Sequence, residues 1–234
     1  MFASRKRLCV EEFPMSLMVF PPLVNIPWLR HGFTLREPGV DVKLDRALAL
    51  EALTEAHHAE LHEEGIAMEN LRLAEQVHGG MVAVVGDAAD TGAPGKPVPQ
   101  ADGLVTVRAG IPLGIHVADC CAVFLVNRHR RAIGLLHSGR KGTEANIVAE
   151  GMRQLCAISG GDPAEVFAIL SPCIQACCYE VDFSSEIERQ LENAGVGGIW
   201  KQHECTGCDL QRYYSYHKEM GKTGRMLAFL MVTS

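Results

Sequence analysis

The chain has 234 residues, of which 47% are hydrophobic and 21% are charged, and its formal net charge is -6. This length suits one domain with a substantial core, and no apolar run approaches the roughly 20 residues that a membrane-spanning helix needs. The acidic balance excludes a general nucleic-acid binder, because such proteins hold phosphate backbones with an excess of Lys and Arg. We therefore expect a soluble protein that acts on a small substrate.

The N-terminal segment is expected to be a loose tail over residues 1–20, followed by one catalytic domain over residues 21–234. A basic run at residues 5–7 precedes apolar residues, as in a secretory signal, but acidic residues and prolines interrupt the apolar stretch. Met15 or Met18 is an equally good start site. The nine cysteines include adjacent pairs, which rarely form disulfides with each other, so we expect reduced thiols in the cytoplasm.

The first predicted element is a long helix, whole or broken, over residues 42–66. Leucines recur there at helical spacing among good helix formers. His58 and His62 lie four residues apart on this helix and could hold a metal together. The glutamates around them favour solvated side chains instead.

Short apolar runs dominate the rest of the chain and predict strands, many of them buried on both faces. Strands are expected over residues 71–77, 81–86, 103–107, 113–117, 121–126, 132–136 and 166–170. The proline-rich stretch 91–100 predicts a loop. Helices are expected over residues 143–158 and 184–194, and a closing hairpin over 213–216 and 225–232, turned at Gly221. This order predicts an α/β fold in which helices flank a mixed sheet.

A glycine-rich basic loop over residues 137–142 separates a buried strand from a helix in this prediction. The first N–H groups of a helix lack internal partners and carry the positive end of its dipole, so such a junction suits an anion. Arg140 and Lys141 favour phosphate there. The alternative is an ordinary exposed turn with Thr143 as the N-cap.

Three potential metal ligands, His78, Cys120 and His137, stand at the ends of apolar runs. Imidazole and thiolate suit Zn²⁺, and three protein ligands leave a fourth position for water or substrate, as in catalytic sites. Asp119, next to Cys120, is expected to orient a ligand. The alternative is that these are buried, hydrogen-bonded side chains without a metal.

A second group of thiols is a candidate structural zinc site. It comprises Cys173, Cys177, Cys178, Cys205 and Cys208. A second CxxC pair is missing, so buried or incidental thiols are the preferred interpretation.

Short segments of one recognisable pattern run in order over about residues 28–232. They are HGFTLR (31–36), EQVHG (75–79), ADGLVT (101–106), VADC (117–120), HSGRKGT (137–143), CCYEV (177–181), CT (205–206), SY (215–216) and TGRM (223–226). Together they resemble the YfiH/LACC1-type family, long labelled multicopper polyphenol oxidoreductase or laccase-domain proteins. Each segment alone is weak, whereas the ordered set is specific.

The resemblance implies an α/β fold with mixed β-sheets layered between helices, and a zinc ion held by His78, Cys120 and His137. It also implies phosphorolysis of adenosine, inosine and methylthioadenosine, with adenosine deamination as a second reaction. Copper is the less favoured metal, because multicopper chemistry needs several metal ions close together and more paired histidines than these motifs supply. A purine nucleoside and phosphate are the expected partners, and the oligomeric state stays open.

The chain departs from the family pattern around the expected substrate. Arg140 stands where the family commonly has Trp, and Lys141 where it has Arg. Lysine offers a point charge and not a bidentate fork, so phosphate geometry is expected to differ. His217 stands where an arginine usually follows Ser-Tyr, and Ala122 replaces a proline. These changes leave the expected metal ligands intact.

The sequence thus predicts that Lys141, together with Arg36 and Arg140, binds a phosphate that attacks the ribose C1′. In deamination, zinc would lower the pKa of a water molecule that attacks purine C6. Three other functions stay open: a cysteine hydrolase with Cys120 as the nucleophile, a copper polyphenol oxidase, and a zinc-binding protein without catalysis. A cell-wall precursor as the substrate also stays open.

Overall fold

The computed structural model describes residues 17–86, 90 and 95–233. The strands are β1 (Leu17–Met18), β2 (Leu29–Thr34), β3 (Arg72–Leu73), β4 (Val82–Val84), β5 (Gly103–Thr106), β6 (Leu113–Val117), β7 (Cys121–Asn127), β8 (Ala132–Ser138), β9 (Val166–Leu170), β10 (Gly198–Lys201) and β11 (Met226–Val232). The helices are α1 (Pro21–Val24), α2 (Arg46–Ala52), α3 (Thr54–Glu63), α4 (Arg140–Glu144), α5 (Ile147–Ser159) and α6 (Phe183–Asn193), with 3₁₀ turns at Met68–Asn70 and Pro163–Glu165.

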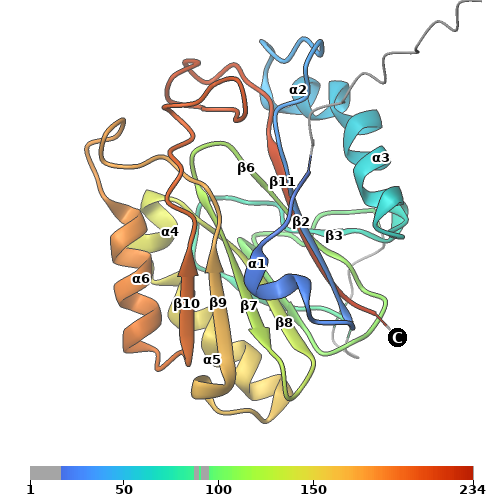
Figure 1. Ribbon diagram of the computed structural model, residues 1–234, viewed down its shortest axis with the longest axis vertical. Helices are drawn as coiled ribbons and strands as arrows, with labels where there is room; N and C mark the ends of the chain where they lie inside the picture. The colour runs from blue at the N-terminus through green and yellow to red at the C-terminus, as the bar shows by residue number, and fades with distance from the viewer. Residues whose placement is uncertain (1–16, 87–89, 91–94, 234) are drawn as a thin grey trace, which may run out of the picture.

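These strands form two mixed sheets (Figure 1). One has the order β1-β2-β11-β6-β3 and the other the order β10-β9-β7-β8-β5-β4. Neighbours are antiparallel except in the pairs β3–β6, β4–β5 and β9–β10. The chain passes from the first sheet to the second between β6 and β7, through residues 118–120.

The central strands of the six-stranded sheet are buried on both faces. In β7, Phe124 and Val126 face the core that lies between the two sheets. The alternate residues Val123 and Leu125 belong to a second core beneath α5. Burying each such side chain contributes roughly 1.5–3 kcal/mol, which explains why this strand reads as a continuous apolar run.

Helices cover the outer face of each sheet. On the six-stranded sheet, α5 packs with Ile147 and Leu155 in the second core. On the five-stranded sheet, Leu61 of α3 joins Leu227 and Phe229 of β11 in a third, smaller core. The structure therefore has helices, two mixed sheets and helices in succession within a single domain, and the predicted fold class is confirmed.

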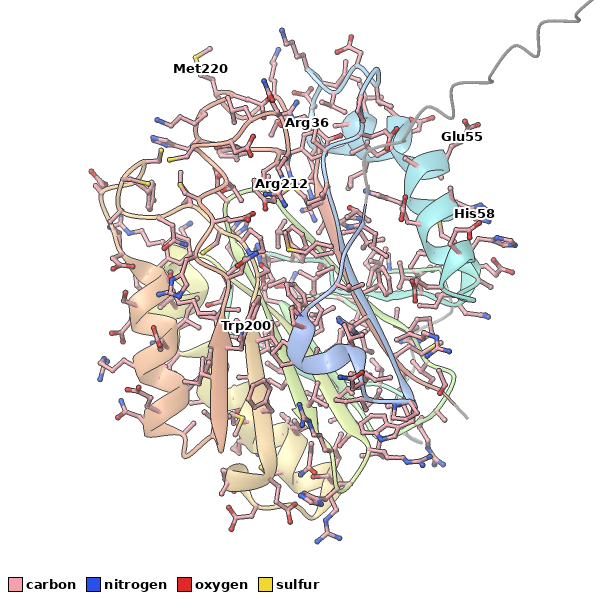
Figure 2. All side chains as sticks on the ribbon, viewed as in Figure 1. Arg36, Glu55, His58, Trp200, Arg212 and Met220 are labelled. Atoms are coloured by element: carbon pink, nitrogen blue, oxygen red, sulfur yellow. The ribbon has the colours of Figure 1, made fainter. Side chains whose placement is uncertain are left out.

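The predicted long helix over residues 42–66 is broken into α2 and α3 at Leu53, which ends one and precedes the other. The break lets Ala49 and Leu53 enter the core between the sheets while Leu61 packs on the outer face. Figure 2 shows His58 pointing away from the body of the protein, as expected for a solvated side chain.

The predicted helix over residues 143–158 begins earlier and is also divided. The short α4 starts at Arg140, directly after Gly139, and α5 starts after Asn146, whose φ of 54° is left-handed. The predicted glycine-rich loop over residues 137–142 is therefore wrong, because β8 runs through Ser138 and leaves Gly139 alone before the helix.

The prediction of a closing hairpin over residues 213–216 and 225–232 is also wrong. Residues 213–216 form no strand, and Tyr213 and Tyr214 are instead fully buried in the core between the sheets. Instead, β11 pairs with β6 and with β2. The strand patterns did not predict β2 or β10.

The predicted loose tail over residues 1–20 lies mostly outside the described residues. The tail prediction is wrong for residues 17–20, because Leu17 and Met18 pair with β2 and Phe20 is fully buried. The predicted loop over residues 91–100 also lies partly outside them. Among the described helices, none is long and apolar enough to cross a membrane.

Candidate metal centre and its cavity

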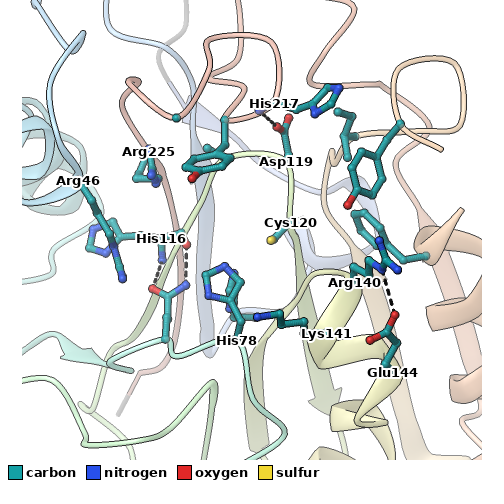
Figure 3. A pocket seen from close by; sticks show the side chains of 18 of the residues that line it. Arg46, His78, His116, Asp119, Cys120, Arg140, Lys141, Glu144, His217 and Arg225 are labelled. Atoms are coloured by element: carbon teal, nitrogen blue, oxygen red, sulfur yellow. Dashed lines mark hydrogen bonds and ion pairs between the residues drawn. The ribbon is translucent and has the colours of Figure 1, made fainter. Parts of the chain in front are cut away.

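Three chain segments meet at one end of the two sheets. His78 lies between β3 and β4, Cys120 lies where the chain crosses between the sheets, and His137 is near the end of β8. One possible ligand atom from each side chain lies within 4.8 Å of the other two. Figure 3 shows His78 and Cys120 side by side at the cavity. The structure thus brings together the three residues that the sequence predicts as metal ligands.

Asp102 holds both histidines in place. This carboxylate is fully buried just before β5. One oxygen, Oδ1, lies 2.9 Å from His137 Nδ1 and accepts the His78 backbone N–H at 2.9 Å, while Oδ2 accepts the Gly79 N–H at 2.7 Å. A carboxylate on Nδ1 fixes a proton there and leaves Nε2 with its lone pair for a metal.

The backbone around the three side chains is shaped for close approach. A Cβ at Gly139 would lie 2.3 Å from Cys120 Sγ, so any larger residue would displace the thiol. His78 and Asp119 have φ values of 63° and 81°, in the left-handed region that costs a non-glycine residue roughly 1–2 kcal/mol. The fold holds these strained residues at the site.

Charge at the site favours a thiolate. Burial raises the pKa of Cys120, but His137 and His78 more than offset it and lower that pKa to about 6. Burial lowers the pKa of His137, but the Cys120 thiolate and Asp102 more than offset it and raise that pKa to about 9. Without a metal, the two side chains therefore form a thiolate–imidazolium pair.

The donor set fits a zinc ion. Two imidazole nitrogens and one thiolate are ligands that Zn²⁺ prefers, and a carboxylate behind a ligating histidine is the usual supporting contact. All three side chains line the same cavity, and three protein ligands would leave a fourth coordination position for water or substrate.

The cavity has a volume of about 900 Å³, in the range of pockets for small ligands. Lys141 and Arg140 line one side of it, and Arg46, His116 and Arg225 line the other (Figure 3). Aromatic rings complete the wall; they are Tyr179, Phe183 and Tyr216. The cavity therefore combines cationic groups for an anion with flat apolar surfaces for a ring.

A family described as "Multi-copper polyphenol oxidoreductase laccase" matches residues 30–187 and 182–233. The chain belongs to this family. The resemblance predicted from the sequence motifs is thereby confirmed.

Curated relatives of this laccase-family chain carry one functional name. This chain is 31% identical to a purine nucleoside phosphorylase of Deinococcus radiodurans, over 89% of this chain and 92% of that protein. It is 28% identical to purine nucleoside phosphorylase SCO2081 of Streptomyces coelicolor, over 85% and 93%. It is also 28% identical to purine nucleoside phosphorylase YlmD of Geobacillus stearothermophilus, over 70% and 72%.

Solved structures support the fold. The crystal structure of YlmD from Geobacillus stearothermophilus aligns with a TM-score of 0.80 at 24% identity and covers 92% of this chain and 94% of that one. A hypothetical protein YfiH of Bacillus licheniformis aligns with a TM-score of 0.77 at 22% identity, over 88% and 93%.

Arg36 is not where the sequence-based interpretation of this laccase-family chain placed it. It does not line the cavity. Its Nη2 is 2.6 Å from Glu219 Oε2, its Nε donates to the Tyr213 carbonyl at 3.0 Å, and it lies over the Tyr214 ring. The guanidinium is therefore committed to the protein, and we withdraw Arg36 as a phosphate ligand.

Asp119 lines the cavity, and its hydrogen-bond partners lie on later loops of the chain. It accepts hydrogen bonds from Thr206 Oγ1 at 2.7 Å, Ser215 Oγ at 3.0 Å and the His217 N–H at 2.7 Å. The carboxylate that contacts a histidine ring of the site is Asp102. Asp119 thus ties two later loops to the Cys120 turn.

Arg140 and Lys141 both line the cavity, from the first turn of α4. Arg140 is tied to Glu144, with Nε 3.0 Å from Oε1. His217 and Ala122, which depart from the family pattern, differ in position: His217 lines the cavity, and Ala122 is buried between the sheets. The substitutions nearest the cavity are therefore Arg140, Lys141 and His217.

Sequence reasoning missed three important residues. Asp102 carried a signal, because an acid at the start of an apolar run becomes buried with the strand and needs partners. Arg225 carried only its place in the TGRM motif, and Arg46 carried no signal, since only the fold brings α2 and the start of β11 to the cavity. Arg225 is 8% exposed and donates to the carbonyls of Thr223 and Gly224.

Proposed function

We propose that this protein is a zinc-dependent purine nucleoside phosphorylase acting on adenosine, inosine and methylthioadenosine. The observation that carries the proposal is the meeting of His78, Cys120 and His137 within 4.8 Å at a cavity of nucleoside size. The curated relatives that carry this name support the reaction. The donor set supports zinc, which when bound would act as a Lewis acid towards a substrate oxygen or water.

The cationic side of the cavity suits phosphate. Lys141, assisted by Arg140, is proposed to hold the anion, and the aromatic residues Tyr179 and Tyr216 to flank the purine. A phosphate oxygen forms a bond to the ribose C1′ while the bond from C1′ to the base nitrogen breaks. Its electron pair leaves with the base, which takes up a proton, and ribose 1-phosphate remains.

Adenosine deamination is proposed as a second reaction at the same site. Water adds at purine C6 and ammonia leaves, which gives inosine. Asp102 would keep the His137 ring oriented in both reactions. The eight described cysteines are free thiols, and we propose the reducing cytoplasm as the location.

The test is to incubate purified zinc-loaded protein with adenosine, with and without phosphate, and to separate the products. Adenine and ribose 1-phosphate should appear only with phosphate, and inosine in both cases. Cys120→Ser should lose both reactions. Cys156→Ser, which changes a thiol on α5 away from the cavity, is the matched control and should keep them. If the zinc-loaded wild type forms neither adenine with ribose 1-phosphate nor inosine, the proposal is contradicted.

A cysteine hydrolase is the second candidate, favoured by the thiolate–imidazolium pair of Cys120 and His137. Metal content separates the two functions. A metal-free active protein that is inactivated by alkylation of Cys120 would support the hydrolase. Robust zinc binding without turnover of any nucleoside would support a non-catalytic zinc protein.

Copper polyphenol oxidation is disfavoured by the ligands at the cavity. In the described part of the chain, the cavity group consists of two histidines and one cysteine. Multicopper chemistry needs several copper ions side by side, each with its own ligands. A test of phenol oxidation with copper-loaded protein should therefore show no more turnover than the Cys120→Ser variant.

A further inference from the structure

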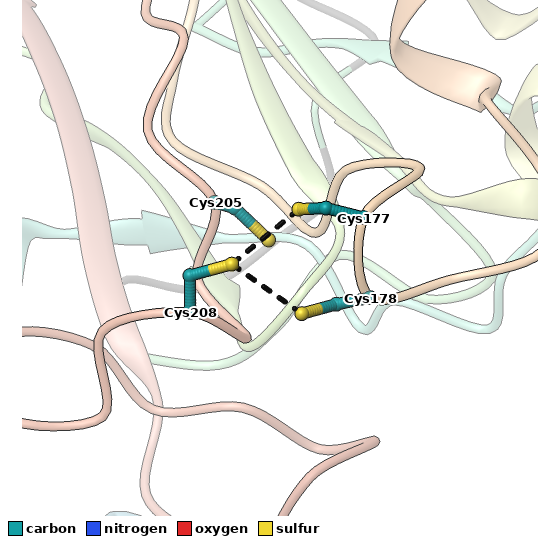
Figure 4. A group of neighbouring side chains, drawn as sticks. All are labelled: Cys177, Cys178, Cys205 and Cys208. Carbon is teal, nitrogen blue, oxygen red and sulfur yellow. Dashed lines mark hydrogen bonds between the residues drawn. The ribbon is translucent and has the colours of Figure 1, made fainter.

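A second group of possible metal ligands consists of four cysteines and shares no residue with the cavity group. Cys177 and Cys178 follow β9, and Cys205 and Cys208 follow β10. Figure 4 shows the four sulfurs turned towards a common centre. All four lie within 4.8 Å of one another, and Cys208 Sγ is 3.4 Å from that of Cys177 and 3.5 Å from that of Cys178.

This spacing matches a tetrahedral metal site. Zinc–thiolate bonds of about 2.3 Å at tetrahedral angles place the sulfurs about 3.8 Å apart. The cluster lacks a second CxxC pair, but two adjacent cysteines on one loop supply the same number of sulfurs. The sequence pattern alone did not reveal this, because the loops after β9 and β10 meet only in the fold.

The backbone supports sulfur ligands. The Gln175 N–H donates to Cys205 Sγ at 3.3 Å, a contact that stabilises a thiolate. Between the two cysteines of the CTGC segment, a Cβ at Gly207 would lie 3.0 Å from Cys178 Cβ and 3.2 Å from its Sγ. The turn that carries Gly207 therefore packs tightly against the opposite cysteine pair.

A disulfide is the main alternative use of four close thiols. It would join Cys208 to one of its neighbours, and the remaining two thiols could form a second disulfide. Cys208 approaches Cys177 and Cys178 almost equally, as ligands of one ion do, and does not favour a single partner.

We propose that Cys177, Cys178, Cys205 and Cys208 bind a structural Zn²⁺ as a tetrathiolate. Four sulfurs complete the tetrahedron and leave no position for a substrate. Cys177 and Cys208 are exposed, which gives the ion a path of entry.

The position of the cluster gives the ion a role in shaping the cavity. Tyr179, which lines the cavity, directly follows Cys178. Thr206, between the two CTGC ligands, donates to Asp119 at 2.7 Å. The metal thus fastens together two loops that carry cavity wall and hold the turn beside Cys120.

The test is the zinc content of purified, reduced protein measured by elemental analysis. Because the first site is itself a proposal, the variants are compared in pairs. Cys208→Ser and Cys177→Ser should each contain one zinc equivalent less than the wild type, and Cys120→Ser should also lose one equivalent. Combining Cys120→Ser with Cys208→Ser should leave none, while Cys156→Ser should match the wild type. Unchanged zinc in both Cys208→Ser and Cys177→Ser would overturn the tetrathiolate site and leave the cavity site untouched.

Cobalt gives a readout that does not depend on whether the cluster variants fold. In Cys120→Ser loaded with Co²⁺, four sulfur ligands should give intense thiolate-to-cobalt charge-transfer absorption and tetrahedral d–d bands. Lack of that absorption contradicts the proposal. So does mass spectrometry that finds a disulfide among the four cysteines in protein purified without oxygen.

Discussion

The two sulfur-containing clusters of this protein differ in origin, donors and exposure. The cavity group joins His78, Cys120 and His137 from segments far apart in the chain, and the buried Asp102 contacts the His137 ring and the His78 backbone. The cysteine group lies on two loops nearer the surface and consists of sulfur alone. Three mixed ligands with an open side suit chemistry, whereas four thiolates suit a structural link. The number of ligands and their exposure thus distinguish a proposed catalytic metal site from a proposed structural metal site.

The sharpest contrast is between one ligand of each group. Cys120→Ser should lower phosphorolysis at least about 100-fold, because Lewis-acid stabilisation worth several kcal/mol is lost. Cys208→Ser should instead lower the midpoint of thermal unfolding and affect turnover less. Initial rates and calorimetry on both variants measure this. Equal loss of activity at 25 °C would remove the proposed division of roles.

Gly139→Ala tests how closely the cavity group depends on its backbone. The new Cβ would stand 2.3 Å from Cys120 Sγ, so the thiol must move. We expect loss of zinc affinity of about 10- to 100-fold, comparable to disturbing a supporting contact. Gly79→Ala is the nearby control, since its Cβ would stand 3.4 Å from Asp102 and should have a smaller effect. Competition with a chromogenic chelator measures both, and equal affinities would contradict the steric argument.

Asp102 and Asp119 are two carboxylates beside different ligands of the cavity group, Asp102 at the histidines and Asp119 next to Cys120. Asp102→Asn removes the charge that holds His137, and we expect zinc affinity to fall about 10-fold or more. Asp119→Asn should keep zinc while weakening bonds to the loops after β10, at about 1–3 kcal/mol of unfolding free energy. Chelator titration and urea unfolding separate the two effects. Zinc loss in Asp119→Asn alone would reverse the assigned roles.

Lys141 tests whether the cationic side of the cavity binds phosphate. Lys141→Ala should raise KM for phosphate about 10-fold, the loss of one charged hydrogen bond. Arg140→Ala should have a smaller effect, because Arg140 is already tied to Glu144. Kinetics at varied phosphate and fixed adenosine measure both. If Arg225→Ala alone raises this KM, phosphate binds on the opposite side of the cavity.

The smallest predicted effect concerns His31, which belongs to neither the cavity group nor the cysteine group. Burial lowers its pKa from 6.5 to about 4, and its Nε2 accepts the Phe20 N–H at 2.9 Å. Below pH 6.5 the unfolded chain therefore binds the proton more readily than the folded one, so stability falls as pH drops from 6.5 towards 4.

Between pH 7 and pH 5.5, the unfolding free energy of His31→Gln should fall by about 1 kcal/mol less than that of the wild type. Urea unfolding of wild type and variant at both pH values measures it. Both proteins carry the same two metal groups, so contributions from those groups cancel in the difference. Parallel pH dependence in the two proteins would exclude His31 as a source of acid sensitivity.

The local prediction succeeded where burial left a strong pattern. The strands β5 to β9 read as continuous apolar runs because both of their faces are covered, and α5 and α6 show helical periodicity. It failed at residues 213–216, where the apolar pattern of two buried tyrosines resembles that of a strand. At residues 42–66 it left open whether the helix is whole or broken, and the structure has two helices that pack in different cores. Local periodicity indicates which side chains are buried, but it does not indicate which sheet or helix they pack against.

The fold class, the family resemblance and the three side chains of the cavity group could be predicted from the sequence, because ordered motifs and apolar runs are local features. Three contacts became visible only in the folded chain: Asp102 with the two histidines, Arg36 with Glu219, and the four cysteines with one another. Those are contacts between segments far apart in the chain, and packing two sheets against each other is what brings them within bonding distance.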